Sequence, residues 1–256
     1  MWDSLIINPM INVLLMVYDF LGNNFGIAII VFTGLIRLIT WPLTAKSMRS
    51  TQKMQEMQNT KKWKAIQKKY KDNKQKLQEE QMKLYKEIGF NPLGGCLPTL
   101  IQFPVIIGLY QAIIRVMASS PISLLELSDH IYDFVPSSLI PINSNFLWMD
   151  LGQPERLFLP FLPNIGIPVL TILVVITSYF STKIATPVSP DSSGSQMTKM
   201  MGVYMPLLMG YLAYTYNAGL AVYFVASNFL AVLQNVLMRK PKLDELLPSR
   251  KAKSKS

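Results

Sequence analysis

Residues 25–43 read FGIAIIVFTGLIRLITWPL, an apolar stretch whose single charged residue is Arg37. A helix of about 20 apolar residues is needed to cross the hydrocarbon core of a bilayer. The stretch has that length and that composition. It therefore predicts a membrane-spanning helix, and this prediction decides the fold class expected for the whole chain.

Four further apolar segments follow along the chain, at residues 93–117, 165–183, 203–216 and 219–238. The last two form a predicted hairpin around residues 217–219, and segment 203–216 is short enough to require helix tilt or local thinning of the bilayer. We predict an all-α, polytopic membrane protein. Its core, at residues 25–238, contains five transmembrane helices.

The composition supports a membrane protein over a soluble domain. Of the 256 residues 50% are apolar and 16% are charged, whereas a soluble domain carries about 25% charged residues. The net charge is nevertheless +10. An apolar chain that is also basic must separate these properties along its sequence, which favours cationic loops beside a membrane over a nucleic-acid binder. We expect no DNA partner.

Residues 1–24 are apolar but are interrupted by Asp3, Pro9 and Asp19. No basic residue precedes them, so they lack the charged start of a secretory signal peptide. We predict an interfacial amphipathic helix that lies at the membrane surface.

The charges of the loops alternate in sign from one predicted crossing to the next. Residues 46–88 carry thirteen basic and five acidic residues, whereas residues 119–156 carry one basic and five acidic residues; residues 1–24 are net acidic, and residues 183–199 and 239–256 are net basic. By the positive-inside rule the basic loops are cytoplasmic. We therefore expect the N-terminus and loop 119–156 outside and the C-terminus in the cytoplasm. A bacterial plasma membrane is expected, because no Arg- and Ser-rich transit segment precedes the first span.

The cytoplasmic loop 46–88 is predicted to be a helical hairpin. It has good helix-forming residues throughout and a natural turn at residues 71–74. Its basic residues are interpreted as a solvated face attracted to anionic lipids, and a docking role for a partner is compatible with that. The basic tail 239–256 is predicted to bind polyanions, either anionic lipid or ribosomal RNA.

Arg37 is the residue that suggests a function. An Arg at mid-membrane costs about 2.5–3.5 kcal/mol and usually faces a partner or water, and the other predicted spans contain no Asp or Glu. Two interpretations stay open: Arg37 snorkels to the headgroups, or it lies in a wet cavity. Helical spacing places Ile30 and Thr33 on its face and Leu35 on the opposite one. Neutral polar residues available to line a cavity are Thr33, Gln102, Gln111, Thr177, Asn228 and Gln234.

Ordinary enzyme chemistry is poorly supported. The chain has one cysteine, Cys96, and one histidine, His130, which suffice neither for an intrachain disulfide nor for an ordinary structural zinc site. No GxxxxGK[ST] phosphate loop occurs. We expect no enzymatic activity, no metal and no cofactor.

Three long motifs resemble the YidC/Oxa/Alb family of membrane protein insertases. They are residues 27–43 (IAIIVFTGLIRLITWPL), 91–111 (NPLGGCLPTLIQFPVIIGLYQ) and 205–234 (MPLLMGYLAYTYNAGLAVYFVASNFLAVLQ). Their order and the loop between the first two are similar to those of the compact five-span family members. Asn217 stands where a proline is usual, Phe224 where another aromatic is common, and Asn59-Thr60 lacks the expected helix-breaking proline.

The resemblance implies a hydrophilic groove that is open to cytoplasm and lipid. By that likeness Arg37 attracts acidic residues of an incoming protein, and lipid takes up the client's apolar helix without nucleotide hydrolysis. Thr33 and Tyr223 match positions that face the client, although ordinary helix packing is the alternative for both. We expect a groove formed by Arg37, Thr33, Gln102, Tyr223, Asn228 and Gln234. Implied partners are nascent membrane proteins, with the ribosome and the Sec translocon as candidates; a transporter or channel subunit and a passive scaffold are the rival functions.

Overall fold

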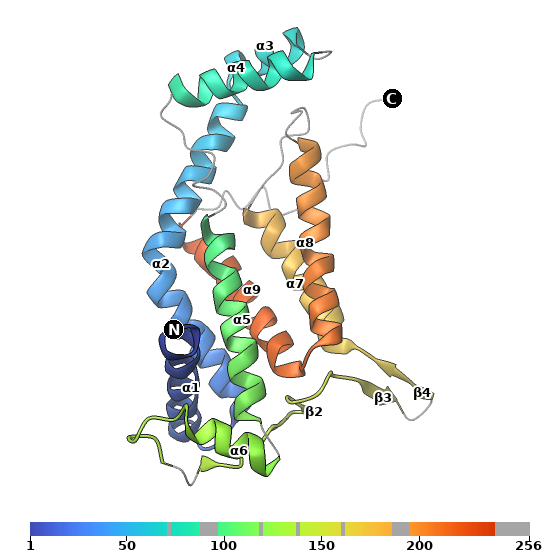
Figure 1. Ribbon diagram of the computed structural model, residues 1–256. Coiled ribbons are helices and arrows are strands. Elements are labelled where there is room, and N and C mark those ends of the chain that lie inside the picture. The colour runs from blue at the N-terminus through green and yellow to red at the C-terminus, as the bar shows by residue number, and fades with distance from the viewer. Residues whose placement is uncertain are drawn as a thin grey trace.

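The computed structural model describes residues 1–70, 73–87, 97–117, 120–136, 139–159, 162–185 and 195–238. A bundle of helices that run along one another forms its body (Figure 1). These helices are α2 (Phe25–Gln58), α5 (Leu97–Val116), α7 (Val169–Ala185), α8 (Ser195–Thr215) and α9 (Ala218–Met238). The helices α3 (Lys61–Lys69) and α4 (Lys74–Glu87) lie at one end, and α6 (Pro121–Ser128) lies at the other.

The bundle helices coincide only in part with the predicted spans. Helix α9 begins one residue before the predicted span 219–238, and α8 begins well before residue 203. The predicted start of the third span at residue 165 is wrong. Residues 165–167 belong to strand β4, and α7 begins at Val169 because Pro168 has no N–H to continue a helix from the preceding turn.

Several of these helices are long and apolar enough to cross a membrane. Within the described residues, helices of sufficient length and hydropathy are Asp3–Phe20, Phe25–Gln58 and Ala218–Met238, and shorter apolar helices are Gln102–Val116 and Val169–Ala185. Large apolar side chains on their outer faces are exposed, for example Leu38 (64%) and Ile39 (77%). This surface is suited to lipid, whereas the number of crossings stays a prediction.

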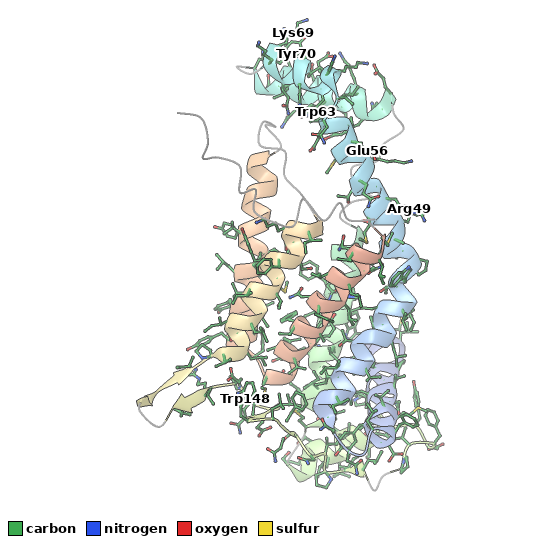
Figure 2. The ribbon with its side chains drawn as sticks, turned by 180° about the vertical axis from the view of Figure 1, so that it is seen from behind. Arg49, Glu56, Trp63, Lys69, Tyr70 and Trp148 are labelled. Carbon is green, nitrogen blue, oxygen red and sulfur yellow. The ribbon has the colours of Figure 1, made fainter. Side chains whose placement is uncertain are left out.

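Helix α2 does not end with the apolar span but continues to Gln58. The chain then breaks at Asn59-Thr60, where the Thr60 hydroxyl accepts a hydrogen bond from the Trp63 N–H and caps α3. Figure 2 shows Trp63 where α3 and α4 meet the end of α2. Segment 46–88 is thus helical, but its first part belongs to α2, and part of the predicted turn, residues 71–72, lies outside the described residues.

A small apolar cluster holds α3 and α4 together. Trp63 and Leu84 are buried against Met57 from the end of α2. Ile66 and Tyr85 pack against this cluster and are partly buried. Burial raises the pKa of the Tyr85 phenol above its ordinary value, because the charged form loses hydration.

The N-terminal segment is a helix docked on the bundle. A π-helical turn at Asp3–Ile7 continues into α1 (Asn8–Phe20), whose buried face includes Ile11 and Leu14. A Cβ at Gly108 of α5 would lie 2.7 Å from Ile6 and from Met10, so this glycine permits the close approach of α1 to α5. The position of α1 at the membrane surface stays a prediction.

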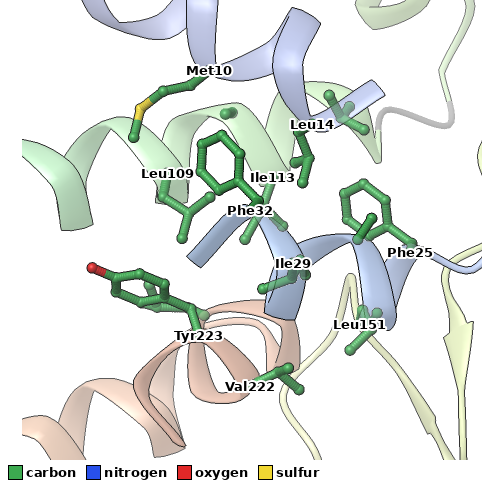
Figure 3. Close-up of a cluster of buried hydrophobic side chains, with 14 of the residues drawn as sticks. Met10, Leu14, Phe25, Ile29, Phe32, Leu109, Ile113, Leu151, Val222 and Tyr223 are labelled. Carbon is green, nitrogen blue, oxygen red and sulfur yellow. The ribbon is translucent and has the colours of Figure 1, made fainter. Parts of the chain in front are cut away.

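A dry core fills the end of the bundle near α6, and we call this region the packed half. Side chains from α1, α2, α5 and α9 meet there around Ile29, Phe32 and Ile113 (Figure 3). The start of α9 closes the region, because the N–H groups of Ala218 and Gly219 donate to the carbonyls of Gln153 and Leu151 at 2.8 and 3.0 Å. A Cβ at Gly219 would lie 3.3 Å from the Leu151 carbonyl oxygen, which explains a glycine at this contact.

The loop near α6 contains short strands that the all-α prediction did not include. Strand β1 (Asn145–Phe146) pairs with β2 (Met149–Asp150), and β3 (Leu157–Leu159) pairs with β4 (Leu162–Ile167), both antiparallel. The buried carboxylate of Glu155 links the loop to the bundle. It accepts hydrogen bonds from the Trp148 indole and from the Leu170 N–H in the first turn of α7, each at 3.0 Å.

Candidate functional site

A cavity of about 230 Å³ lies between the helices beyond the packed half, and we call this region the cavity half. Apolar side chains such as Phe103, Met205 and Met209 form part of its wall. Its polar lining residues are Thr33, Arg37, Thr40, Thr44, Gln102, Ser178, Thr182, Tyr223, Ser227 and Asn228. The cavity therefore gathers polar groups from α2, α5, α7 and α9 within an otherwise apolar bundle.

Arg37 reaches across the cavity from α2 to α9. Its Nη2 donates to the carbonyl oxygen and to the hydroxyl of Ser227, both at 2.8 Å. Within the described part of the chain, Arg37 makes no ion pair, and both of its hydrogen bonds to Ser227 use Nη2. By contrast, Arg115 at the other end of the bundle pairs with Asp3 at 2.8 Å. Arg37 thus keeps a full charge and further N–H donors in a polar, partly buried space.

Tyr223 and Thr33 lie at the end of the cavity that borders the packed half. Both are almost fully buried, at 2% and 1% exposure. The Tyr223 hydroxyl accepts a hydrogen bond from the Gln102 amide, and the Thr33 hydroxyl donates to the Ile29 carbonyl at 2.6 Å. These bonds hold both side chains within the protein, and the two residues form the floor of the cavity.

Asn228 and Gln234 connect α9 to its neighbours. The Asn228 amide donates to Ser178 at 2.7 Å and to Thr177 at 3.3 Å, which ties α9 to α7. The buried Gln234 amide donates to the Thr44 hydroxyl at 2.7 Å, which ties α9 to α2. Bonds of this kind hold polar helix faces together where an apolar contact would leave donors unpaired.

The structure brings most of the predicted groove residues to one place. Thr33, Arg37, Gln102, Tyr223 and Asn228 line the cavity, and Gln234 lies next to it through its bond to Thr44. Their role in binding is not tested by this geometry.

Two polar residues considered for the cavity have other positions. Gln111 accepts a hydrogen bond from the Trp2 indole at 3.0 Å, beside α1. Thr177 donates to the Leu173 carbonyl of its own helix at 2.8 Å, accepts a hydrogen bond from Asn228 and does not line the cavity.

The expected position of Ile30 in the cavity is wrong. Ile30 is 41% exposed and does not line the cavity, although it lies two turns from Arg37 on the same helical stripe. The cavity ends at Thr33, so residues before it on that stripe meet other surroundings. Leu35 does not line the cavity either, as its spacing predicts.

The sequence reasoning missed the hydroxyl groups that complete the lining. These are Thr40, Thr44, Ser178, Thr182 and Ser227. A signal for them exists, because Thr33, Arg37, Thr40 and Thr44 recur at intervals of three and four residues, which is one helical face. Hydroxyl groups are tolerated in apolar helices because they bond to carbonyls of their own turn, as Thr40 does with Ile36 at 2.8 Å.

The arrangement favours binding over bond-breaking chemistry. A permanent cation surrounded by neutral hydroxyl and amide groups attracts a carboxylate, and the same groups form hydrogen bonds with a polar segment. The cavity's apolar wall suits the side chains of an apolar helix. The cavity thus offers both polar and apolar contacts to a bound segment.

Apolar outer faces and a polar interior cavity define a multi-pass membrane protein. A family model described as "60Kd inner membrane protein" matches residues 16–245. The chain belongs to this family, that of the YidC/Oxa/Alb membrane protein insertases.

Relatives from several bacteria carry insertase names. "Membrane protein insertase MisCA" of Bacillus subtilis is 31% identical, over 99% of this chain and 85% of its own length. "Membrane protein insertase YidC 2" of Listeria innocua is 33% identical, over 94% of this chain and 72% of its own length. "Membrane protein insertase YidC" of Chlorobaculum tepidum is 36% identical over 87% of this chain, which spans 34% of that relative.

A solved structure has a similar fold. It is described as "Active YidC insertase crystal structure with the first transmembrane domain resolved" and is 27% identical, with a TM-score of 0.55. The match covers 85% of this chain and 42% of that chain. The names of these relatives describe insertion into membranes and no chemical reaction.

Proposed function

We propose that the protein inserts transmembrane segments of client proteins into the membrane, and helps them fold, through the cavity that carries Arg37. The insertase names of its relatives support this function. Insertion requires no nucleotide in this proposal, because the favourable transfer of an apolar helix into lipid supplies the free energy. The clients are nascent membrane proteins.

The observation that carries the proposal is the bonding of Arg37. Its contact with Ser227 employs neutral acceptors, and within the described residues no carboxylate neutralises it. A cation in such surroundings acts on an approaching carboxylate more strongly than one in bulk water. Acidic residues at the leading end of a client are therefore drawn into the cavity half.

The packed half gives the process a direction. We propose that the α3–α4 end is cytoplasmic, with the N-terminus outside and the C-terminus inside a bacterial plasma membrane. A client enters the cavity half from the cytoplasm and meets Thr33 and Tyr223 at its floor. The buried apolar core beyond them supports a closed outer side, and in this proposal the client's apolar part leaves sideways into lipid.

Basic segments at the cytoplasmic end are proposed to recruit partners. Helix α3 carries basic residues such as Lys61, Lys64 and Lys69, and we propose that it binds anionic lipid. The tail 239–256, which lies outside the described residues, is proposed to contribute to ribosome binding. The Sec translocon is a further candidate partner.

Replacement of Arg37 tests the proposal. We expect Arg37→Ala to abolish insertion of clients with acidic outer tails and Arg37→Lys to retain part of it, because attraction requires a cation but not the guanidinium fork. Arg49→Ala is the matched control, since Arg49 is an exposed cation on the same helix. Insertion is measured by protease protection of a client in reconstituted vesicles.

The same variants separate the rival functions. Full insertion by Arg37→Ala contradicts the proposed role of the cation and favours a passive scaffold. A solute or ion flux that depends on Arg37, without any effect on insertion, favours a transporter or channel subunit.

A further inference from the structure

Strands β3 and β4 form an apolar hairpin that extends sideways from the bundle. Residues 157–167 read LFLPFLPNIGI and contain no charged residue. In Figure 1 the two strands project from the ends of α7 and α8, away from the remaining helices. An apolar hairpin that leaves the body of a protein requires an environment that covers it.

In the described part of the hairpin, the aromatic side chain of β3 is exposed. Phe158 is 59% exposed. Opposite it in the strand register is Gly166, where a Cβ would lie 3.2 Å from the Phe158 ring and 3.0 Å from Arg156. The ring therefore rests across the backbone of β4 and presents its other side to the surroundings.

The base of the hairpin is fastened to the bundle. The Arg156 guanidinium lies over the Tyr214 ring of α8, 5.2 Å from its centroid. The adjacent carboxylate of Glu155 caps α7, and β4 is joined to α7 through Pro168 alone. The direction of the hairpin is thus set by two bundle helices.

The fastening places the hairpin at the level where the apolar helices end. Helix α7 exposes Ile172 and Leu173 within its first turns, at 49% and 41%. Tyr211 and Tyr214 are exposed near the end of α8. Exposed aromatic residues at helix ends mark the membrane–water interface, where the headgroups lie.

We propose that the β3–β4 hairpin lies in the membrane interface at the α6 end of the bundle. There it anchors the start of α7 and the end of α8 to the lipid headgroups. The occupant of its apolar face is the bilayer that the chain spans, because β4 joins α7 through Pro168 and α7 exposes the apolar Ile172 and Leu173 within its first turns. This inference rests on the chain being a multi-pass membrane protein and is independent of what the cavity binds.

The backbone sets the depth of the hairpin. A two-stranded hairpin has two edges with unpaired N–H and C=O groups, which hydrocarbon does not tolerate. Headgroups and their water satisfy these groups, while the acyl-chain boundary takes up the Phe158 ring. The hairpin therefore lies at the interface and not in the hydrocarbon core.

A fluorescent depth measurement tests this position. An NBD group is attached to Phe158→Cys in a full-length Cys96→Ala chain, reconstituted in phosphatidylcholine–phosphatidylglycerol vesicles. Gln153→Cys, at an exposed polar residue of the same loop, is the control. We expect NBD at position 158 to lose most of its fluorescence to nitroxide lipids labelled near the headgroup, and to be shielded from aqueous iodide. At position 153 we expect the reverse.

Other results contradict the proposal. Iodide quenching at position 158 equal to that at position 153 places the hairpin in water, and quenching by neither agent places it against protein. Stronger quenching by nitroxides deep in the acyl chains contradicts the interfacial depth. If Phe158→Cys does not fold, the label is placed at Leu157→Cys, which lies on the opposite face of β3. Quenching there by headgroup nitroxides without quenching by iodide supports the interfacial position, and any other result contradicts it.

Discussion

Helix α2 passes through two different environments within one apolar sequence. In the packed half, its side chains Phe25, Ile29 and Phe32 are buried in the dry core. In the cavity half, Thr33, Arg37, Thr40 and Thr44 occupy the same side of the helix and line the cavity. The contrast shows that one helix both closes the bundle and supplies its polar interior.

Helix α9 changes in the same way and at the same level. Residues 218–224 are all buried, most of them apolar, whereas the polar Ser227, Asn228 and Gln234 follow. Tyr223 marks the change on α9 as Thr33 does on α2, and both line the cavity floor. Because α2 and α9 change from apolar to polar residues at the same level, one boundary separates the packed half from the cavity half. Substitutions on its two sides should therefore have different consequences. Those in the packed half should cost stability, and those in the cavity half should cost function.

The largest loss of stability is expected from a cavity in the packed half. Ile113 is fully buried between α5 and its neighbours, whereas Ile114, the next residue, is 46% exposed. Ile113→Ala should lower the free energy of unfolding by about 2–5 kcal/mol. Ile114→Ala, the matched control, should change it by no more than about 0.5 kcal/mol. Unfolding in detergent micelles measures both, and equal losses would show that the packed half is not a tight core.

A smaller loss is expected at the loop that closes the packed half. Glu155→Gln keeps the size of the side chain but cannot accept both the Trp148 and Leu170 donors equally well. Leaving a buried donor unpaired costs about 1–3 kcal/mol. Thermal unfolding of this variant should therefore begin earlier, whereas Glu126→Gln, at an exposed carboxylate, should behave like the unsubstituted chain. Identical melting of the two variants would contradict a stabilising role for the Glu155 hydrogen bonds.

The turn before α9 should contribute about as much as an ordinary helix cap. The Asn217 side chain accepts a hydrogen bond from the Leu220 N–H at 3.1 Å, which gives a physical reason for an asparagine where the family usually has proline. Asn217→Ala should cost about 1 kcal/mol, and Asn217→Asp should retain most of the stability. Guanidinium titration in micelles distinguishes them, and a more stable Ala variant would argue against the cap.

The smallest effect on stability is expected in the cavity half. The Thr40 hydroxyl bonds within its own helix, to Ile36, so Thr40→Val should change the free energy of unfolding by no more than about 0.5 kcal/mol. Insertion of clients should nevertheless decrease, because the cavity loses a polar group beside Arg37. Ile39→Val, on the exposed face of α2, should affect neither quantity. If Thr40→Val lost enough stability to explain its whole insertion defect, the cavity half would not differ from the packed half in this respect.

Hydropathy and helical spacing sufficed for the helices themselves. They located α2, α9 and the residues Arg37, Gln102 and Asn228 that meet in the cavity. These two signals gave wrong positions for residues whose surroundings depend on contacts between helices. Ile30 has the helical spacing of a cavity residue but lies beyond the cavity floor. Gln111 accepts a hydrogen bond from the Trp2 indole, away from the cavity. Neither fact follows from one helix considered alone.

Helix ends were predicted less well than helices. Helix α2 continues through Pro42, a residue that often ends a helix, and extends to Gln58 because helix-forming residues follow the apolar span as far as Asn59. The last residues of β4, 165–167, were predicted to begin a span, because an apolar run has no period that distinguishes a strand from a buried helix. Pro168 was the available signal for that boundary.

The central claim is that the cavity half is wet and opens on one side of the membrane only. Single cysteines at positions 38, 39, 40 and 44, in a Cys96→Ala chain, test it directly with a membrane-impermeant thiol reagent. Positions 38 and 39 are the most demanding controls, because Leu38 and Ile39 are more exposed than Thr40 yet face outward. The account predicts labelling at 40 and 44 from the cytoplasmic side, none at 38 and 39, and none from outside. Labelling at 40 from both sides, or at none of the four positions, would contradict it.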